Sequence, residues 1–359
     1  MIEIFAEEFS KNSALAIYLG TFVTIVFCLA VCFAPLSQHK NGSHLIHGPQ
    51  TIHTYPTPRI GGLGAFIALW LQALFMSGDS VHFAFAVLMG VTPVFCLGFA
   101  EDITNFISPS IRLLASLFAG FGFCVFTGVW ITNVDLSWAN KILTISGVGI
   151  VFTALAIAAL SNAFNIIDGL NGLSIGTALM IALTIAILAS LQSDDVVLLL
   201  SVCLASTLTG IFLFNFPLGK IFIGDGGAYL MGAMIASLAV LLSERNEGVS
   251  PFASALLVSY PFYELLRSFL RRLIVSDGAP MQPDNKHLHS LMFSYIRRRI
   301  RLKAVFSNSL ASCVILLLPI MSCIWALRYF DDRDKLVIGI LLLILAYETA
   351  MRVLRKKLS

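Results

Sequence analysis

Long apolar runs separated by short polar stretches make up most of the chain. A membrane-spanning helix requires about 20 mostly apolar residues, and about eleven runs approach that length: roughly 14–36, 61–77, 83–100, 110–130, 142–161, 173–192, 196–214, 227–243, 249–270, 305–327 and 335–351. The pattern predicts an all-α polytopic membrane protein with about 11 transmembrane helices in a single domain, residues 1–359. We expect the polar stretch 271–304 to form a long loop with some structure of its own.

The composition excludes a water-soluble or a disordered protein. Hydrophobic residues make up 58% of the chain and charged residues 12%, whereas soluble domains have about 25% charged residues and disordered chains have low hydrophobicity. The seven cysteines all lie in apolar runs without metal-ligand spacing, so we expect them to be packing residues. The acidic amino terminus argues against a cleaved signal peptide.

The distribution of lysine and arginine predicts the orientation in the membrane. If the amino terminus lies outside, 17 of the 23 Lys and Arg residues fall in inside segments. Positive residues collect on the cytosolic side of a membrane. The pattern therefore predicts an amino terminus outside and a carboxyl terminus in the cytosol, with most of the asymmetry coming from residues 267–303 and the carboxyl-terminal tail.

Unusual polar residues gather in five segments that this orientation places on the cytosolic side. The segments are 52–62, with Arg59; 98–102, with Glu101 and Asp102 and with Arg112 nearby; 162–173, with Asn165, Asp168 and Asn171; 215–227, with Asn215, Phe222 and Asp225; and 283–289, with His287 and His289. The loops on the other side have ordinary polar residues. We therefore expect the active site in the cytosolic loops.

Most of these segments have a structural as well as a functional interpretation. The adjacent acids Glu101 and Asp102 are typical of a solvated helix end, because charges collect at membrane borders. Asp168 lies between two apolar runs, near membrane depth, where ionisable residues are usually functional, and Asn165 would share its face on a helical turn. Asp225, bracketed by glycines, fits either an exposed functional carboxylate or a plain turn.

The chemistry of these side chains favours a hard metal ion. His287 and His289 fit either a metal pair or phosphate donors, and no cysteine or further nearby histidine completes a tetrahedral zinc site. Carboxylates and amides without thiolates indicate Mg²⁺, which keeps several waters and bridges phosphates. Acids, histidines and arginines together on one side of the membrane favour a metal–diphosphate site.

The ordered motifs PTPRxGG, (E/D)D, NxxNxxDGxxGL, NxPxxxxFxGDxG and HxH lie between about residues 50 and 290. This set resembles the polyprenyl-phosphate N-acetylhexosamine-1-phosphate transferases of glycosyltransferase family 4, in particular the bacterial undecaprenyl-phosphate GlcNAc-1-phosphate transferases. The resemblance implies transfer of an N-acetylhexosamine-type sugar 1-phosphate (GlcNAc or a derivative) from a UDP-sugar to undecaprenyl phosphate, releasing UMP. It implies Mg²⁺, with Mn²⁺ as an alternative, and a multi-pass protein of the bacterial inner membrane that initiates O-antigen or cell-envelope polysaccharide synthesis. No nucleic-acid partner is expected, and a homodimer is left open.

The resemblance also implies roles for individual residues. Asp225 matches a metal ligand, and the matches to catalytic positions are Glu101, Asp102, Asp168, His287 and His289. The matches to substrate-binding positions are Asn165, Asn171, Asn215 and Phe222, the last near the uridine. Arg59 and Arg112 are candidates to bind the remaining anionic charge of the substrate or, equally, lipid headgroups. Which of Glu101 and Asp102 is the base stays open.

Three positions depart from the family pattern, and two other functions remain as alternatives. Glu101 stands where most relatives have Asp, Asn171 replaces a common Asp, and Ser290 replaces a further histidine. The segments PTPRIGG and HLHS differ from those of the peptidoglycan enzyme, which disfavours a MurNAc-pentapeptide substrate.

The alternatives are a lipid or sugar transporter or flippase, which would favour charges inside the spans, and an inactive family scaffold. One-step transfer is favoured over a covalent aspartyl intermediate.

Overall fold

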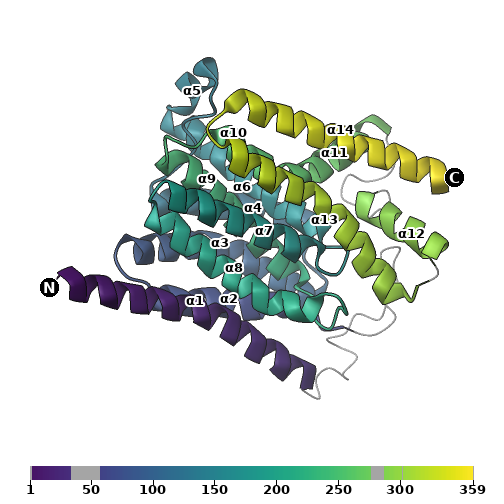
Figure 1. Ribbon diagram of the computed structural model, residues 1–359, viewed down its shortest axis with the longest axis horizontal. Coiled ribbons are helices and arrows are strands. Elements are labelled where there is room, and N and C mark those ends of the chain that lie inside the picture. Colours follow the sequence, from purple (N-terminus) through teal and green to yellow (C-terminus); the bar gives the residue numbers. More distant parts are fainter. Residues whose placement is uncertain (1, 34–56, 276–286, 301, 359) are drawn as a thin grey trace.

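The computed structural model describes residues 2–33, 57–275, 287–300 and 302–358, and the regular structure within these ranges is helical (Figure 1). The helices are α1 (Ile2–Phe33), α2 (Gly61–Leu74), α3 (Asp79–Thr104), α4 (Pro109–Thr127), α5 (Ser137–Leu143), α6 (Ser146–Ile167), α7 (Leu173–Leu191), α8 (Asp195–Asn215), α9 (Gly224–Arg245), α10 (Pro251–Leu257), α11 (Ser259–Val275), α12 (Leu288–Ile300), α13 (Ala304–Tyr329) and α14 (Arg333–Leu358). Helix α1 forms one edge of the bundle and α14 the opposite edge (Figure 1). The predicted all-α fold class is confirmed.

Within the described ranges, nine helices are long and apolar enough to cross a membrane. They correspond to nine of the predicted runs. The predicted run 61–77 contains only α2, an apolar helix of 14 residues. The predicted run 249–270 is not one helix, because α10 ends at Leu257 and α11 begins at Ser259. The predicted number of about eleven spans is therefore not confirmed.

The break between α10 and α11 has a local explanation. Pro251 occupies the first turn of α10, where its missing N–H costs nothing, and Ser250 caps that turn by accepting a hydrogen bond from Phe252 N. Helix α11 then has both an apolar and a strongly polar face, the latter including Glu264 and Arg267. Both short helices are apolar on average, so the hydrophobicity of the sequence predicted one continuous span over residues 249–270.

Helix α9 is the centre of the bundle. Eighteen of its 22 residues are buried, and it packs against α2, α3, α6 and α7 as well as more peripheral helices. Small residues such as Gly232, Ala233 and Ala236 let neighbouring backbones approach closely, as is typical of helix contacts within membranes. The amino-terminal end of α9 is therefore fixed in the middle of one end of the bundle.

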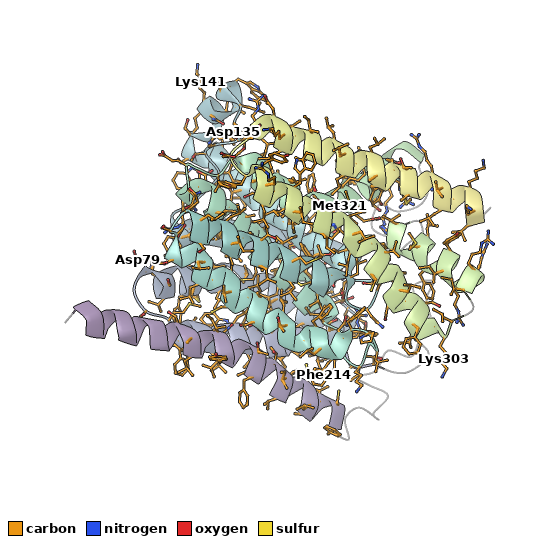
Figure 2. The ribbon with its side chains drawn as sticks, viewed as in Figure 1. Asp79, Asp135, Lys141, Phe214, Lys303 and Met321 are labelled. Atoms are coloured by element: carbon orange, nitrogen blue, oxygen red, sulfur yellow. The ribbon has the colours of Figure 1, made fainter. Side chains whose placement is uncertain are left out.

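That end of the bundle also receives the carboxyl ends of α3 and α6 and the beginning of α13. Figure 2 labels Asp79, at the start of α3, and Lys303, before α13, at opposite ends of the molecule. Asn308, near the beginning of α13, accepts a hydrogen bond at 2.7 Å from the backbone N of Asn171, which follows α6. The described parts of the segments that were predicted to share one side of the membrane thus converge on one end of the bundle, the end where Lys303 lies. Residues 52–56 and 283–286 of the predicted segments lie outside the described residues.

The segment before α2 is held alongside the segment before α9 by backbone hydrogen bonds. Phe222 N donates to Pro58 O at 2.9 Å, and the N–H groups of Gly61 and Gly62 donate to Phe222 O at 2.9 Å and Ile223 O at 2.8 Å. These bonds place Arg59 at the amino-terminal end of α9. The approach is possible because position 62 has no side chain: a Cβ there would lie 2.4 Å from the Cα of Gly227.

We expect Gly62→Ala to destabilise the protein, because its methyl group must push α2 away from α9. Overpacking of this kind costs about 1–3 kcal/mol, which should lower the midpoint of thermal unfolding in detergent. Gly147→Ala in α6 is the control, because a Cβ at Gly147 meets no heavy atom within 4 Å. Equal midpoints for the two variants would contradict a tight contact between α2 and α9.

Candidate active site

The candidate site is built on the first turn of α9, where the side chain of Asp102 binds the helix end. Asp102 Oδ1 accepts a hydrogen bond from Asp225 N at 2.8 Å, and Asp102 Oδ2 accepts one from Gly226 N at 2.9 Å. A carboxylate in this place satisfies amides that have no partner within the helix and complements the positive end of its dipole. The Asp102 side chain is only 2% exposed.

Gly224 allows this close contact. Its φ of +76° lies in the left-handed region that favours glycine. A Cβ at this position would lie 2.4 Å from Arg59 O and 2.6 Å from Asp102 Oδ2. Glycine at position 224 is therefore required both by the backbone conformation and by the space available.

Two arginines bind the carboxylate of Asp225. Arg59 Nη2 lies 2.8 Å from Asp225 Oδ1, and Arg112 Nη1, from α4, lies 2.5 Å from Asp225 Oδ2. Arg59 Nε also lies 3.8 Å from Asp102 Oδ1. Burial works against the charge of Arg59, but Asp225 and Asp102 outweigh it and raise its pKa above the ordinary value. The structure thus brings Arg59, Arg112, Asp102 and Asp225 together, as the sequence predicts.

The adjacent acids Glu101 and Asp102 point to different neighbours. Glu101 Oε2 accepts a hydrogen bond from Ile107 N at 2.7 Å, in the turn between α3 and α4, whereas Asp102 reaches α9. Successive residues on a helix point about 100° apart, which explains the divergence. Of the two, Asp102 is the one that contacts the residues around Asp225; a catalytic role for either stays a prediction.

Asp168 lies directly after α6 and belongs to the same electrostatic environment. The hydroxyl of Ser174, in the first turn of α7, donates a hydrogen bond to Asp168 Oδ1. Burial raises the pKa of Asp168 to about 6, and the Ser174 hydrogen bond and the charge of Arg59 oppose this rise. Asn165 lies one helical turn earlier and is half-buried.

Asn171 and Asn215 are buried and bind backbone groups. Asn171 is 1% exposed, and its Nδ2 donates to Pro217 O at 3.1 Å. Asn215 is 4% exposed; its Nδ2 donates to Ile221 O at 2.8 Å and its Oδ1 accepts from Gly172 N at 2.5 Å. These bonds tie the loop after α6 to the loop before α9. The predicted contact of these two asparagines with substrate stays a prediction, and the structure gives both a role in holding the loops.

The remaining predicted residues lie close to these loops. Phe222 is half-buried, beside the segment that contains Arg59. His287 and His289 are each 6% exposed, and their rings stack with centroids 5.3 Å apart and an interplanar angle of 5°. A Cβ on Gly169 would lie 2.5 Å from His289 Nε2. The histidine pair therefore meets the loop that carries Asp168.

The side chains at this end fit a hard cation that is completed by substrate phosphates. Among the described residues, no group of three or more His, Cys, Asp or Glu side chains forms a ready-made metal site. Mg²⁺ is usually bound through one or two carboxylates together with phosphate oxygens and waters. Asp225, whose side chain is 17% exposed, supplies such a carboxylate, so the donor chemistry fits Mg²⁺ or Mn²⁺.

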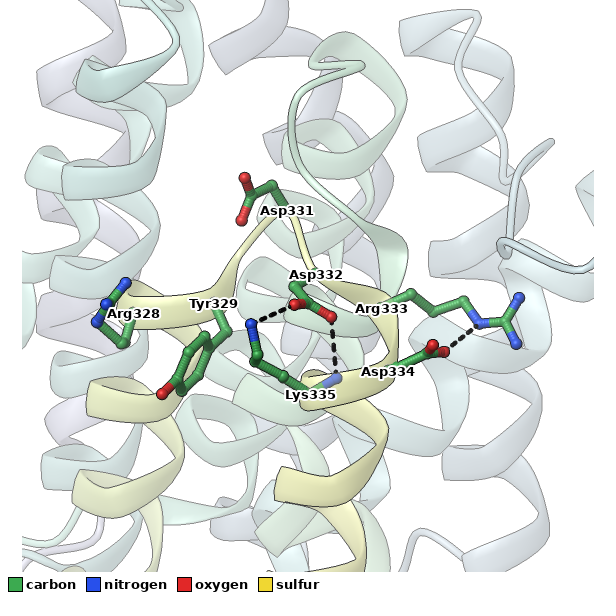
Figure 3. A pocket seen from close by; sticks show the side chains of 7 residues that line it. All are labelled: Arg328, Tyr329, Asp331, Asp332, Arg333, Asp334 and Lys335. Atoms are coloured by element: carbon green, nitrogen blue, oxygen red, sulfur yellow. Dashed lines mark hydrogen bonds and ion pairs between the residues drawn. The ribbon is translucent and has the colours of Figure 1, made fainter.

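A separate cavity of about 650 Å³ lies at the turn between α13 and α14 (Figure 3). Its charged side chains pair with one another, as in the contact of 2.6 Å between Lys335 Nζ and Asp332 Oδ2. Residues rise about 1.5 Å each along a helix, so this turn lies roughly 30 Å from Asn308 at the other end of α13. The cavity is therefore remote from Asp225.

The structure adds residues that the sequence analysis did not assign to the site. Ser174 binds Asp168, and Glu264 in α11 binds His287 Nδ1 at 2.8 Å. The sequence could have indicated Glu264 as a functional residue, because it is an ionisable residue within an apolar run. A serine at the start of an apolar helix gives no such indication.

Comparison with known proteins agrees with this arrangement. A family model described as Glycosyl transferase family 4 matches residues 84–243. An undecaprenyl-phosphate alpha-N-acetylglucosaminyl 1-phosphate transferase of Thermotoga maritima is 30% identical over 261 residues, which cover 72% of this chain and 75% of the relative. The chain belongs to glycosyl transferase family 4. The resemblance stated from the motifs is thereby confirmed.

Other members of glycosyl transferase family 4 are similar over much of their length. A decaprenyl-phosphate N-acetylglucosaminephosphotransferase of Mycobacterium leprae is 29% identical, over 69% of this chain and 70% of the relative. A phospho-N-acetylmuramoyl-pentapeptide-transferase of Leuconostoc citreum is 27% identical, over 60% of this chain and 73% of the relative. The family model begins after Arg59 and ends before His287, so it covers the centre of the site but not these two contributors.

We expect Ser174→Ala to move the acid limb of the pH–activity profile to higher pH. If activity needs the Asp168 carboxylate, it falls as the pH drops through the pKa of about 6. Removing the Ser174 donor leaves the charged form less stable, so the pKa of Asp168 rises further. The measurement is kcat/KM as a function of pH.

Thr177→Val is the matched control for this prediction. It removes another hydroxyl of α7, one that donates to Leu173 O at 2.7 Å rather than to Asp168, and should leave the acid limb in place. An acid limb that stays in place or moves to lower pH in Ser174→Ala would contradict the proposed dependence on Asp168.

Proposed function

We propose that the protein transfers an N-acetylhexosamine 1-phosphate, of GlcNAc or a derivative, from a UDP-sugar to undecaprenyl phosphate. The products are a polyprenyl-diphosphate-sugar and UMP. The reaction would initiate O-antigen or another cell-envelope polysaccharide in the bacterial inner membrane. The names of the relatives support the phospho-sugar transfer and the polyprenyl phosphate acceptor.

The observation that carries the proposal is the position of Asp225 between two guanidinium groups at the amino-terminal end of a buried helix. A helix end of this kind favours anions, and arginine suits planar recognition of phosphate oxygens. Asp225 adds a carboxylate that can hold a cation against a diphosphate. Phosphoryl transfer uses all three features, because they neutralise and position anionic groups.

The reaction requires positioning and neutralisation more than covalent chemistry by the protein. A phosphate oxygen of undecaprenyl phosphate attacks the phosphorus that carries the sugar, and the bond from this phosphorus to the bridging oxygen breaks, so that UMP leaves. Both partners are anions, so the enzyme must hold them in line and offset their repulsion. Arg59 and Arg112 are suited to this task, because their guanidinium groups meet at Asp225, the carboxylate assigned to the metal.

A bound Mg²⁺, held by Asp225, would stabilise the negative charge of the leaving phosphate. Asp168, in the loop after α6, supplies a second carboxylate near Arg59. His289 lies against Gly169 in this same loop, and His287 stacks on His289, so both rings could donate hydrogen bonds to phosphate oxygens. Phe222 offers an aromatic face for the uracil base.

The contacts of Asp102 favour a one-step transfer. Both of its carboxylate oxygens accept backbone hydrogen bonds from the first turn of α9, and its side chain is nearly inaccessible. A nucleophile that forms a covalent intermediate needs an oxygen directed at the substrate. Asp102 is better suited to hold α9, and through it Asp225, in place.

The decisive test is an assay of the purified protein with undecaprenyl phosphate, Mg²⁺ and a panel of UDP-sugars, with UMP release as the readout. UMP release that depends on both substrates and is lost on chelation of the metal would support the proposal and identify the sugar. A transporter, a flippase or an inactive scaffold releases no UMP.

We expect Asp225→Asn to lower kcat for UMP release by about 100- to 1000-fold, because it weakens binding of the cation that would offset the negative charge of the phosphates. Asp332→Asn, in the charged turn between α13 and α14, is the control and should keep wild-type activity. Gel filtration in detergent checks that both variants are folded. Near-normal turnover of Asp225→Asn at saturating Mg²⁺ would rule out the assigned metal ligand.

We expect the site to face the cytosol, as the distribution of Lys and Arg predicts. Lys220 and Glu247 are exposed and lie just beyond the two ends of α9. In a background without the native cysteines, a membrane-impermeant thiol reagent added to intact spheroplasts should label Glu247→Cys and not Lys220→Cys. The opposite labelling would place the site outside and overturn the orientation.

A further inference from the structure

A buried carboxylate in α11 lies directly behind the histidine pair. The side chain of Glu264 is 2% exposed. Its Oε1 lies 2.8 Å from His287 Nδ1, and its Oε2 accepts a hydrogen bond from the hydroxyl of Tyr347 in α14 at 2.7 Å. Burial of a carboxylate is costly unless its oxygens are satisfied, and here two donors from two other elements satisfy them.

The hydrogen bonds to Glu264 define the protonation of His287. An ionised carboxylate only accepts hydrogen bonds, and two donated bonds favour the ionised form. The proton of this contact therefore lies on His287 Nδ1. A hydrogen bond to one ring nitrogen fixes the orientation of the imidazole, so Nε2 is the ring nitrogen that faces away from Glu264.

His287 is in turn connected to the candidate site. Its ring is parallel to that of His289, at 5.3 Å between centroids. His289 Nε2 abuts Gly169, the residue next to Asp168. Helix α11, which carries Glu264, packs against α6, the helix that ends at Asp168. The carboxylate, the stacked rings and the loop thus form one continuous packed unit.

We propose that Glu264 is a positioning residue for the transfer reaction: it accepts the Nδ1–H of His287 and thereby orients Nε2, which carries the second proton of the imidazolium when it donates to a phosphate oxygen of the bound sugar nucleotide. This inference rests on the proposed function. Tyr347 completes the arrangement by holding the second oxygen of Glu264. Without the Glu264 carboxylate, the His287 ring could turn a nitrogen of the wrong protonation state toward the phosphate. The substrate would still bind through its other contacts.

The alternative to a positioning role is a purely structural one, in which Glu264 only fastens α11 to α14. The same two helices offer a matched control. Arg267 Nε in α11 pairs with Glu348 Oε1 in α14 at 2.6 Å, and Tyr263 donates to the same oxygen at 3.2 Å. Glu348→Gln weakens the same helix contact and leaves the Glu264–His287 bond intact.

The first experiment compares the two variants in the UMP-release assay. We expect Glu264→Gln to lower kcat by about 10- to 100-fold, the range typical of removing a carboxylate behind a functional histidine. Its KM for the UDP-sugar should stay within about threefold of wild type, since a group that acts mainly in the transition state affects kcat. Glu348→Gln should keep kcat within about threefold. Equal losses in the two variants would overturn the positioning role.

A double variant tests whether Glu264 acts through His287. In a His287→Gln background, Glu264→Gln should cause no further loss beyond about twofold, because residues that act as a unit are not additive. A further loss as large as that in the wild-type background would overturn the proposal.

The second experiment needs neither activity nor a folded Glu264 variant. Nitrogen NMR of the wild-type protein in nanodiscs, with labelled histidine and with His287 assigned through His287→Gln, reports which ring nitrogen carries a proton. We expect a proton on Nδ1. A neutral His287 that carries its proton on Nε2 alone would overturn the proposal. If the wild type released no UMP while NMR placed the proton on Nδ1, the proposed function would fail and the Glu264–His287 pairing would stand.

Discussion

The hydrogen bonds between Asp102 and the first turn of α9 are the interaction on which the rest of the site depends. Helix α9 is buried along most of its length, so its first amide groups cannot be satisfied by bulk water, and unsatisfied polar groups in such a place are costly. Asp102 meets two of them with one carboxylate. Because Asp225 follows directly from this turn, the bonds that complete the helix also set the position of the carboxylate that Arg59 and Arg112 bind.

The balance of charge at this end of the bundle follows from its depth. Carboxylates grouped in a poorly hydrated place repel one another, and nearby guanidinium groups offset that repulsion. Arg59 acts on Asp102, Asp168 and Asp225 at once. The arginines of this site can bind an anion, and its carboxylates can bind a cation. The side chains can exchange these partners with little rearrangement of the backbone.

The sequence predicted which segments meet, because it placed an even number of apolar runs between each motif segment and the next and so put all five on one side of the membrane. The structure brings the described parts of these segments to one end of the bundle, but two of the counted runs, 61–77 and 249–270, are not confirmed as spans. The sequence did not predict what each side chain binds. Asn171 and Asn215 were assigned to substrate from their motifs, yet their partners are backbone groups of distant loops, which only tertiary packing brings near. The run 249–270 was taken as one span because average hydrophobicity does not detect a break at Val258. Glu264 was visible in the sequence as an ionisable residue in that run, but its contact with His287, 23 positions away, was not.

The tight contact of α2 and α3 with the beginning of α9 has a consequence for assembly of the protein in the membrane. Helices inserted into a bilayer associate after each has formed, and synthesis proceeds from the amino terminus. Arg59, Asp102 and Arg112 all precede α9 by more than 100 residues, so they are already inserted when Gly224 leaves the ribosome. Docking of α9 then completes two sets of contacts at once. The first amide groups of α9 gain the Asp102 carboxylate as acceptor, and Arg59 and Arg112 gain the Asp225 carboxylate. A chain truncated before α9 would therefore lack the Asp225 carboxylate that holds Arg59 and Arg112 together at this end of the bundle.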